Sequence, residues 1–119
     1  MAKVASRLRV QDVGGVTRVE FVDKNILDEA NIQQIGEELV KLADAGPRPR
    51  LLLCFKGVDH LSSAALGVLI NVHNRVKAKD GQLRLSDINA QIFEVFKITK
   101  LNKLFQVFDT AEQAMKSFT

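Results

Sequence analysis

The chain has 119 residues, of which 46% are hydrophobic and 26% are charged, and this is the size and composition of one domain with a single apolar core. Its 17 lysines and arginines against 14 acidic residues give a formal charge of +3, and the basic residues are spread along the chain, so a nucleic-acid partner is not indicated. The single cysteine, Cys54, excludes an internal disulfide and a cysteine-based zinc cluster within the chain. Because the sequence contains no signal peptide and no run of about 20 apolar residues, we expect a cytoplasmic protein without a membrane anchor.

The first elements are predicted to be a hairpin and a helix. Alternating apolar and polar residues at 8–11 and 16–23 flank Gly14-Gly15, as is typical of two strands joined by a tight turn. Asp28 is a good N-cap for the helix that follows, which is expected to end near residues 45–47. The apolar residues of this helix are spaced by three or four: Ile32, Ile35, Leu39 and Leu42.

The middle of the chain is expected to form a central strand and a second helix. Leu51-Leu52-Leu53 is a short continuous apolar run within residues 50–55, which favours a strand covered on both faces. The helix is predicted to begin near Ser62-Ser63. It should end near residues 77–81, where lysines suit the helix dipole and Gly81 can adopt a left-handed cap conformation.

The last third of the chain continues the alternation of strands and helices. Residues 82–85 are predicted to form a strand, Asn89 to cap a helix, and residues 106–108 to form a last short strand. Thr110 begins a capping-box pattern for the final helix. The order β-β-α-β-α-β-α-β-α predicts one α/β domain over residues 1–119, with a mixed sheet of four to five strands flanked by about four helices.

The best candidate for a functional site is the loop that leads from the central strand into the second helix, residues 59–68. Sites in α/β sheets usually form at this carboxyl end of the strands. A helix N-terminus stabilises an anion, and phosphorylation of Ser62 or Ser63 would add about −1.5 to −2 charges there. Capping of the helix by one of these serines is the simpler explanation of the pair.

Four segments, in order, make the chain similar to STAS domains of the bacterial anti-sigma factor antagonist type. LLLCFKGVDHLSSAALGVL, residues 51–69, resembles the family signature of a hydrophobic strand, a Gly-Val loop and a helix start of the form Asp-Ser-Ser/Thr-Gly-Leu-Gly. NILDEANIQQIGEEL resembles the approach to the family's first helix. GQLRLSDINAQIFEVFKITKLNKLF resembles its fourth-strand and third-helix region, and VFDTAEQAM its usual ending.

The resemblance implies a single STAS domain that acts in partner switching. The unmodified antagonist would bind an anti-sigma factor, often a serine kinase with a GHKL-type ATP-binding fold, and so free the sigma factor. Phosphorylation by that kinase would end the interaction, and a phosphatase would restore it. The antagonist itself is not expected to be an enzyme or to need a cofactor, and we expect a monomer or a weak homodimer.

The sequence departs from the family pattern at the start of the second helix. With Leu66-Gly67-Val68 as the anchor, the family's Asp falls at Ser62, its first hydroxyl at Ser63, its usual phosphate acceptor at Ala64 and its Gly at Ala65. A shift of the acceptor by one residue rotates the side chain by about 100° around a helix. Two hypotheses therefore stay open: phosphorylation at Ser63 or Ser62, and a constitutive STAS interaction or ligand-sensing module in a larger signalling assembly.

The residues expected to contact a partner lie at this helix start and in the loop before the first helix. Asp28 matches an acidic residue that in the family lies beside the phosphorylation site, and the same residue can cap the first helix. The predicted partner-binding residues are Asp28, Asn31, Ser62, Ser63, Ala64, Leu66 and Gly67.

The remaining reactive side chains favour structural explanations. His60 and His73 have no partners at a metal-binding spacing, so no metal site is predicted, and the Gly-x-Ser-x-Gly elbow of a serine hydrolase is absent. Cys54 stands where relatives often have Asp and is expected to be a buried strand residue, and His73 is expected to be partly buried. Four phenylalanines are interpreted as core residues: Phe93, Phe96, Phe105 and Phe108. Three lysines are interpreted as a solvated surface: Lys97, Lys100 and Lys103.

Overall fold

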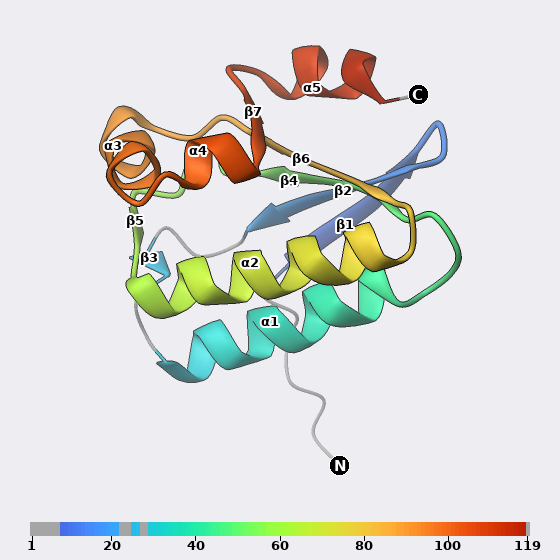
Figure 1. Cartoon of the computed structure of the whole chain (residues 1–119), viewed down its shortest axis with the longest axis horizontal. Coiled ribbons are helices and arrows are strands. Elements are labelled where there is room, and N and C mark those ends of the chain that lie inside the picture. Colours follow the sequence, from blue (N-terminus) through green and yellow to red (C-terminus); the bar gives the residue numbers. More distant parts are fainter. Residues whose placement is uncertain (1–7, 22–24, 27–28, 119) are drawn as a thin grey trace.

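The computed structural model describes residues 8–21, 25–26 and 29–118 (Figure 1). The predicted N-cap Asp28 and the end of the second predicted strand, residues 22–23, lie outside these ranges. The strands are β1 Leu8–Val13, β2 Val16–Phe21, β3 Asn25–Ile26, β4 Arg50–Cys54, β5 His60–Leu61, β6 Gln82–Ser86 and β7 Gln106–Phe108. The helices are α1 Glu29–Ala43, α2 Ser63–Ala78, α3 Ala90–Ile98, α4 Leu101–Leu104 and α5 Ala111–Ser117.

Five of the strands form one mixed sheet in the order β1-β2-β4-β6-β7, which confirms the predicted fold class. The hairpin strands β1 and β2 are antiparallel, and all other neighbours in this sheet are parallel. The hairpin turn has positive φ angles at both glycines, 56° at Gly14 and 85° at Gly15, a turn conformation that β-carbons disfavour. The apolar run of β4 lies in the middle of the sheet, as predicted.

Helices cover the two faces of the sheet unequally. In Figure 1, α1 and α2 lie side by side below the sheet and α5 lies above it. The main core is formed between the sheet and α1 to α4, and its completely buried members include Val19, Leu39, Leu53 and Phe96. On the α5 side the core is small, with Val16, Leu52 and Ala114 as its buried residues.

Three short elements were not predicted: β3, β5 and α4. Their two to four residues are too few to show a hydrophobic period. β3 and β5 pair in parallel, with Asn25 opposite His60 and Ile26 opposite Leu61. This pair joins the segment before α1 to the segment before α2, so both helices begin at the same end of the molecule (Figure 1).

The C-terminal end of α2 differs from the prediction. The left-handed conformation belongs to Asp80, with φ 57°, and not to Gly81. Gly81 is needed for another reason, because a β-carbon there would collide with the carbonyl oxygen of Pro49. That carbonyl accepts a hydrogen bond of 2.7 Å from the N–H of Gln82, which holds the start of β6 against the loop before β4.

Candidate functional site

The start of α2 is shaped by one of its two serines. Ser62 is the N-cap, with extended backbone (φ −85°, ψ 167°), and its side-chain oxygen accepts a 3.2 Å hydrogen bond from the N–H of Ala65. This contact satisfies one of the donors that a helix leaves unpaired at its N-terminus. Ser62 is half-buried, whereas Ser63, the first residue of the helix, is exposed. The two predicted phosphorylation candidates therefore have different environments.

The predicted partner-binding residues of α2 separate into an exposed and a buried group. Ser63, Ala64 and Gly67 are exposed, and Gly67 lies on the same side of the helix as both others because it follows them by four and three residues. Leu66 points the other way: it is 6% exposed and belongs to the main core. One residue's advance along a helix rotates the side chain by about 100°, which places Leu66 in the core of the free protein although its neighbour Gly67 is exposed.

A groove between α1 and α2 adjoins this exposed side. Its volume is about 470 Å³, and the residues that line it are Gln33, Gly36, Glu37, Val40, Lys41, Val68 and Asn71. The helices approach closely here, since a β-carbon on Gly36 would lie 3.3 Å from Cγ1 of Val68. Sequence reasoning did not find the groove, although a lone glycine inside an amphipathic helix is a signal for close packing.

Of the two other predicted contacts, Asn31 and Asp28, the structure describes only Asn31. Asn31 is half-buried in the first turn of α1, and this turn and the start of α2 lie at the same end of the molecule (Figure 1). Asp28 lies outside the described residues. The predicted proximity of the loop before α1 and the start of α2 is supported by the pairing of Asn25 with His60.

Asn89 holds the loop that precedes the helix start. Its side-chain nitrogen donates to the carbonyl oxygens of Val58, at 3.1 Å, and Asp59, at 3.2 Å. Its side-chain oxygen accepts from the N–H of Ile92 at 2.8 Å, which caps α3 as predicted. One side chain therefore fixes the start of α3 and the approach to α2 together. The cap was visible in the sequence, but the contact with a loop 30 residues away was not.

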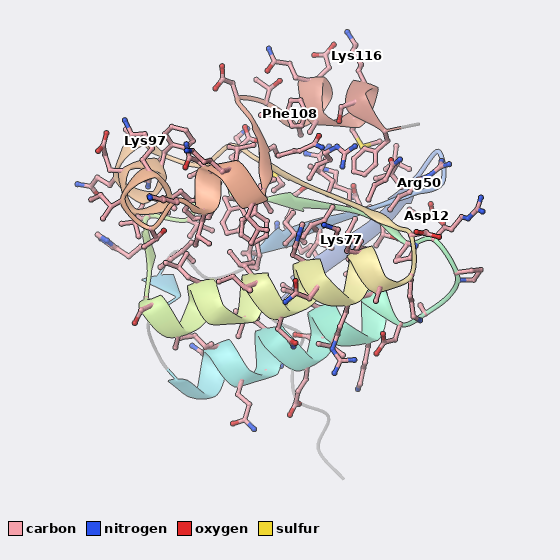
Figure 2. All side chains as sticks on the ribbon, in the orientation of Figure 1. Asp12, Arg50, Lys77, Lys97, Phe108 and Lys116 are labelled. Carbon is pink, nitrogen blue, oxygen red and sulfur yellow. The ribbon has the colours of Figure 1, made fainter. Side chains whose placement is uncertain are left out.

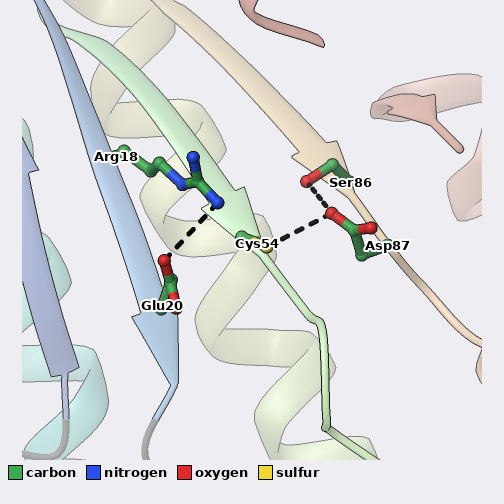
Figure 3. A network of polar contacts seen from close by, with 5 residues as sticks. All are labelled: Arg18, Glu20, Cys54, Ser86 and Asp87. Carbon is green, nitrogen blue, oxygen red and sulfur yellow. Dashed lines mark hydrogen bonds and ion pairs between the residues drawn. The ribbon is translucent and has the colours of Figure 1, made fainter. Parts of the chain in front are cut away.

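A second polar cluster lies at the carboxyl ends of β4 and β6, where Cys54, Ser86 and Asp87 meet (Figure 3). The Cys54 thiol donates to Oδ2 of Asp87 at 3.2 Å, and the Ser86 hydroxyl donates to the same oxygen at 2.9 Å. Burial is the main cause that raises the pKa of the Cys54 thiol, and the neighbouring Asp87 carboxylate raises it too. The thiol is therefore protonated and weakly nucleophilic, in agreement with the predicted structural role of Cys54.

The two histidines lie in different environments. Within residues 8–21, 25–26 and 29–118, no group of three or more potential ligands is arranged to hold an ion. His60 is exposed on β5, whereas His73 is half-buried with its ring edge-on to Phe105, 5.3 Å between centroids. Burial, and to a smaller extent the charge of Lys77, lowers the pKa of His73.

The aromatic and basic residues near α3 behave largely as predicted. Phe96 and Phe105 are core residues with ring centroids 5.9 Å apart, and Phe93 and Phe108 are half-buried. Lys97, Lys100 and Lys103 are exposed, and Lys97 forms a 2.9 Å ion pair with Glu94.

No helix in the described part of the chain has the length and apolar character that crossing a membrane requires.

Comparisons with known proteins agree with this fold. Residues 8–114 match the model of the STAS domain. BtrV of Bordetella bronchiseptica, which is named as an anti-sigma factor antagonist, is 30% identical over 95 residues, or 80% of this chain and 81% of that protein. The chain therefore belongs to the STAS domain family.

Solved structures show the same fold at lower identity. A STAS domain anti-sigma factor antagonist of Planctomyces limnophilus superposes with a TM-score of 0.86 at 20% identity, over 98% of this chain and 100% of that chain. The phosphorylated form of SpoIIAA from Bacillus superposes with a TM-score of 0.69 at 15% identity, over 92% of this chain and 96% of that chain.

Proposed function

We propose that this protein binds an anti-sigma factor through the exposed side of α2 and the adjoining α1–α2 groove. The observation that carries the proposal is the run of small exposed residues Ser63, Ala64 and Gly67. None of them has a side chain longer than a hydroxymethyl group, so a partner can approach the helix backbone closely. The groove beside them offers Val40 and Val68 as apolar contacts, with Glu37 and Lys41 as polar ones.

The partner that fits the family is an anti-sigma factor with serine kinase activity, and a phosphatase completes the cycle. The protein itself acts by binding, without catalysis or a cofactor, in the cytoplasm. A phosphate on Ser63 would add about two negative charges at the edge of the proposed interface and weaken the complex. Ser63 is the better acceptor of the two serines because it is exposed and Ser62 is engaged in the cap.

The second candidate function is a constitutive STAS interaction or ligand-sensing module in a larger signalling assembly. The observation that favours it is Ala64, which stands at the family's usual acceptor position and carries no hydroxyl. Under this candidate, binding through α2 remains but phosphorylation does not control it.

The binding proposal is tested by titrating the purified protein into the anti-sigma factor kinases of the same cells by isothermal titration calorimetry. A 1:1 complex with one of them is expected. Gly67→Glu should weaken that complex strongly, because it places a long charged side chain in the proposed interface. The variant should fold normally, since a β-carbon at Gly67 has nothing within 4 Å in the free protein. Asn102→Glu, at an exposed position on α4, is the matched control. Full affinity of the Gly67 variant would remove α2 from the interface.

Phosphorylation is tested with the kinase so identified and radiolabelled ATP. If Ser63 is the acceptor, Ser63→Ala abolishes incorporation and Ser62→Ala retains it. If neither serine is used, the wild type takes up no phosphate, while Ala64→Ser, which restores the family's acceptor, is phosphorylated. The second pattern would support the second candidate function, in which phosphorylation does not control binding.

A further inference from the structure

A second cleft lies at the other end of α2 from Ser63. Its volume is about 370 Å³, and it opens between the second half of α2, the start of β6, and α4 with the start of β7. The residues that line it are His73, Val76, Lys77, Gly81, Gln82, Leu83, Arg84, Lys103, Leu104 and Gln106. Lys77 lies 14 residues after Ser63, which is roughly 21 Å along a helix, so this cleft is separate from the proposed partner surface.

The register of the sheet creates this cleft. β7 pairs with β6 only from Arg84 onward, opposite Gln106. The first two residues of β6, Gln82 and Leu83, pair with β4 and precede the part of β6 that pairs with β7. The short helix α4 ends just before β7 and brings Lys103 and Leu104 to the open edge.

The charge of the cleft is one-sided. It is lined by Lys77, Lys103 and Arg84, and none of the described residues that line it carries a carboxylate. Arg84 is engaged elsewhere, since it donates to Ser117 and stacks over the ring of Phe118. Within the described ranges, the ammonium groups of Lys77 and Lys103 take part in no ion pair. Two lysines that line one cleft without a carboxylate among its described lining residues are stabilised when an anion enters it.

The rest of the lining includes a ring, an apolar side chain and an amide. His73 contributes a half-buried imidazole, Leu104 an exposed apolar side chain and Gln106 an exposed amide. The volume lies in the range of about 300–1,000 Å³ that small-molecule sites occupy. We propose that this cleft binds a small phosphorylated ligand, with its phosphate between Lys77 and Lys103 and its organic part against His73 and Leu104.

The proposal is tested by titrating inorganic pyrophosphate into the ¹⁵N-labelled protein and following amide chemical shifts. Saturable changes are expected at Gly81, Leu83, Leu104 and Gln106, and they should weaken as the salt concentration rises. The double variant Lys77→Gln/Lys103→Gln should bind at least about tenfold more weakly, because it loses two charge-assisted hydrogen bonds. Lys116→Gln is the control, since this lysine projects from α5 on the other side of the sheet (Figure 2) and should leave the affinity unchanged.

A second variant separates loss of binding from loss of folding. Gln106→Glu places a carboxylate in the cleft at an exposed position and should weaken binding while the thermal unfolding midpoint stays the same. Shifts that spread over many surface lysines, do not saturate, or are the same in the double variant would overturn the proposal. The proposal would also be overturned if a hexaglutamate peptide bound at these residues and pyrophosphate did not. That result would indicate that the cleft binds an acidic protein segment.

Discussion

Gly36 of α1 lies against Val68 of α2 so closely that a β-carbon on the glycine would be 3.3 Å from Cγ1 and 3.4 Å from Cγ2 of the valine. The contact between these two residues therefore limits how closely α1 and α2, the two helices that carry the proposed binding surface, can approach each other. Glycine in the middle of a helix costs about 1 kcal/mol relative to alanine, and at position 36 the close approach of Val68 opposes the gain that alanine would bring.

The first prediction concerns this helix pair. Gly36→Ala should leave the free energy of unfolding unchanged or lower it in the wild type, because the gain in helix propensity is lost to the contact with Val68. In a Val68→Ala background the same change should raise the free energy of unfolding by up to about 1 kcal/mol. Urea unfolding of the four proteins measures this coupling, and equal effects of Gly36→Ala in both backgrounds would contradict the close contact.

The second prediction distinguishes the two serines at the start of α2. Ser62→Ala removes the cap to the N–H of Ala65 and should lower the free energy of unfolding by about 1 kcal/mol. Ser63→Ala removes an exposed hydroxyl and should change it by less than about 0.5 kcal/mol. Thermal unfolding of both variants provides the test. A larger loss of stability in the Ser63 variant would contradict the assignment of the cap to Ser62.

The third prediction concerns the packing of α2. Leu69 is 3% exposed, and Leu69→Ala should cost about 2–5 kcal/mol of stability through lost burial and the cavity that remains. Leu104→Ala, at a position that is 39% exposed, is the control and should cost much less. Chemical denaturation gives both values, and similar losses would contradict the placement of Leu69 in the core.

The fourth prediction follows from the lowered pKa of His73, whose cause is burial and then the charge of Lys77. As the pH falls below the ordinary histidine pKa of 6.5, the unfolded chain takes up a proton that the folded protein binds only at lower pH. The free energy of unfolding should therefore decrease between pH 6.5 and the folded pKa of His73, and its contribution should be constant below that.

His73→Gln tests this dependence, with His60→Gln as the matched control because His60 is exposed. Unfolding free energies at a series of pH values should lose part of their slope below pH 6.5 in the first variant and keep it in the second. If His73→Gln kept the slope and His60→Gln lost it, the pH dependence of stability would not come from His73.

Much of this architecture follows from patterns in the sequence. The Gly14-Gly15 turn, the apolar run of β4 and the caps at Ser62, Asn89 and Thr110 all carry local signals that the structure confirms. The fold class was also accessible, because the order of strands and helices leaves few topologies.

What the sequence did not reveal depends on contacts between distant segments. The β3–β5 pair, the contact of Asn89 with Val58 and the cleft beside Lys77 each join residues that are far apart in the chain. Leu66 shows the same limit at short range: the family motif identified its neighbourhood, and only the helix phase against the sheet decided that it is buried.

The central claim is that the exposed start of α2 binds the anti-sigma factor and that negative charge there weakens the complex. Calorimetric titration of the anti-sigma factor with Ser63→Asp, Ser63→Ala and the control Asn102→Asp tests it most directly. The account predicts wild-type affinity for the alanine variant and the control, and an affinity lower by about tenfold or more, or about 1.4 kcal/mol, for Ser63→Asp. Equal affinities of the two Ser63 variants would contradict it.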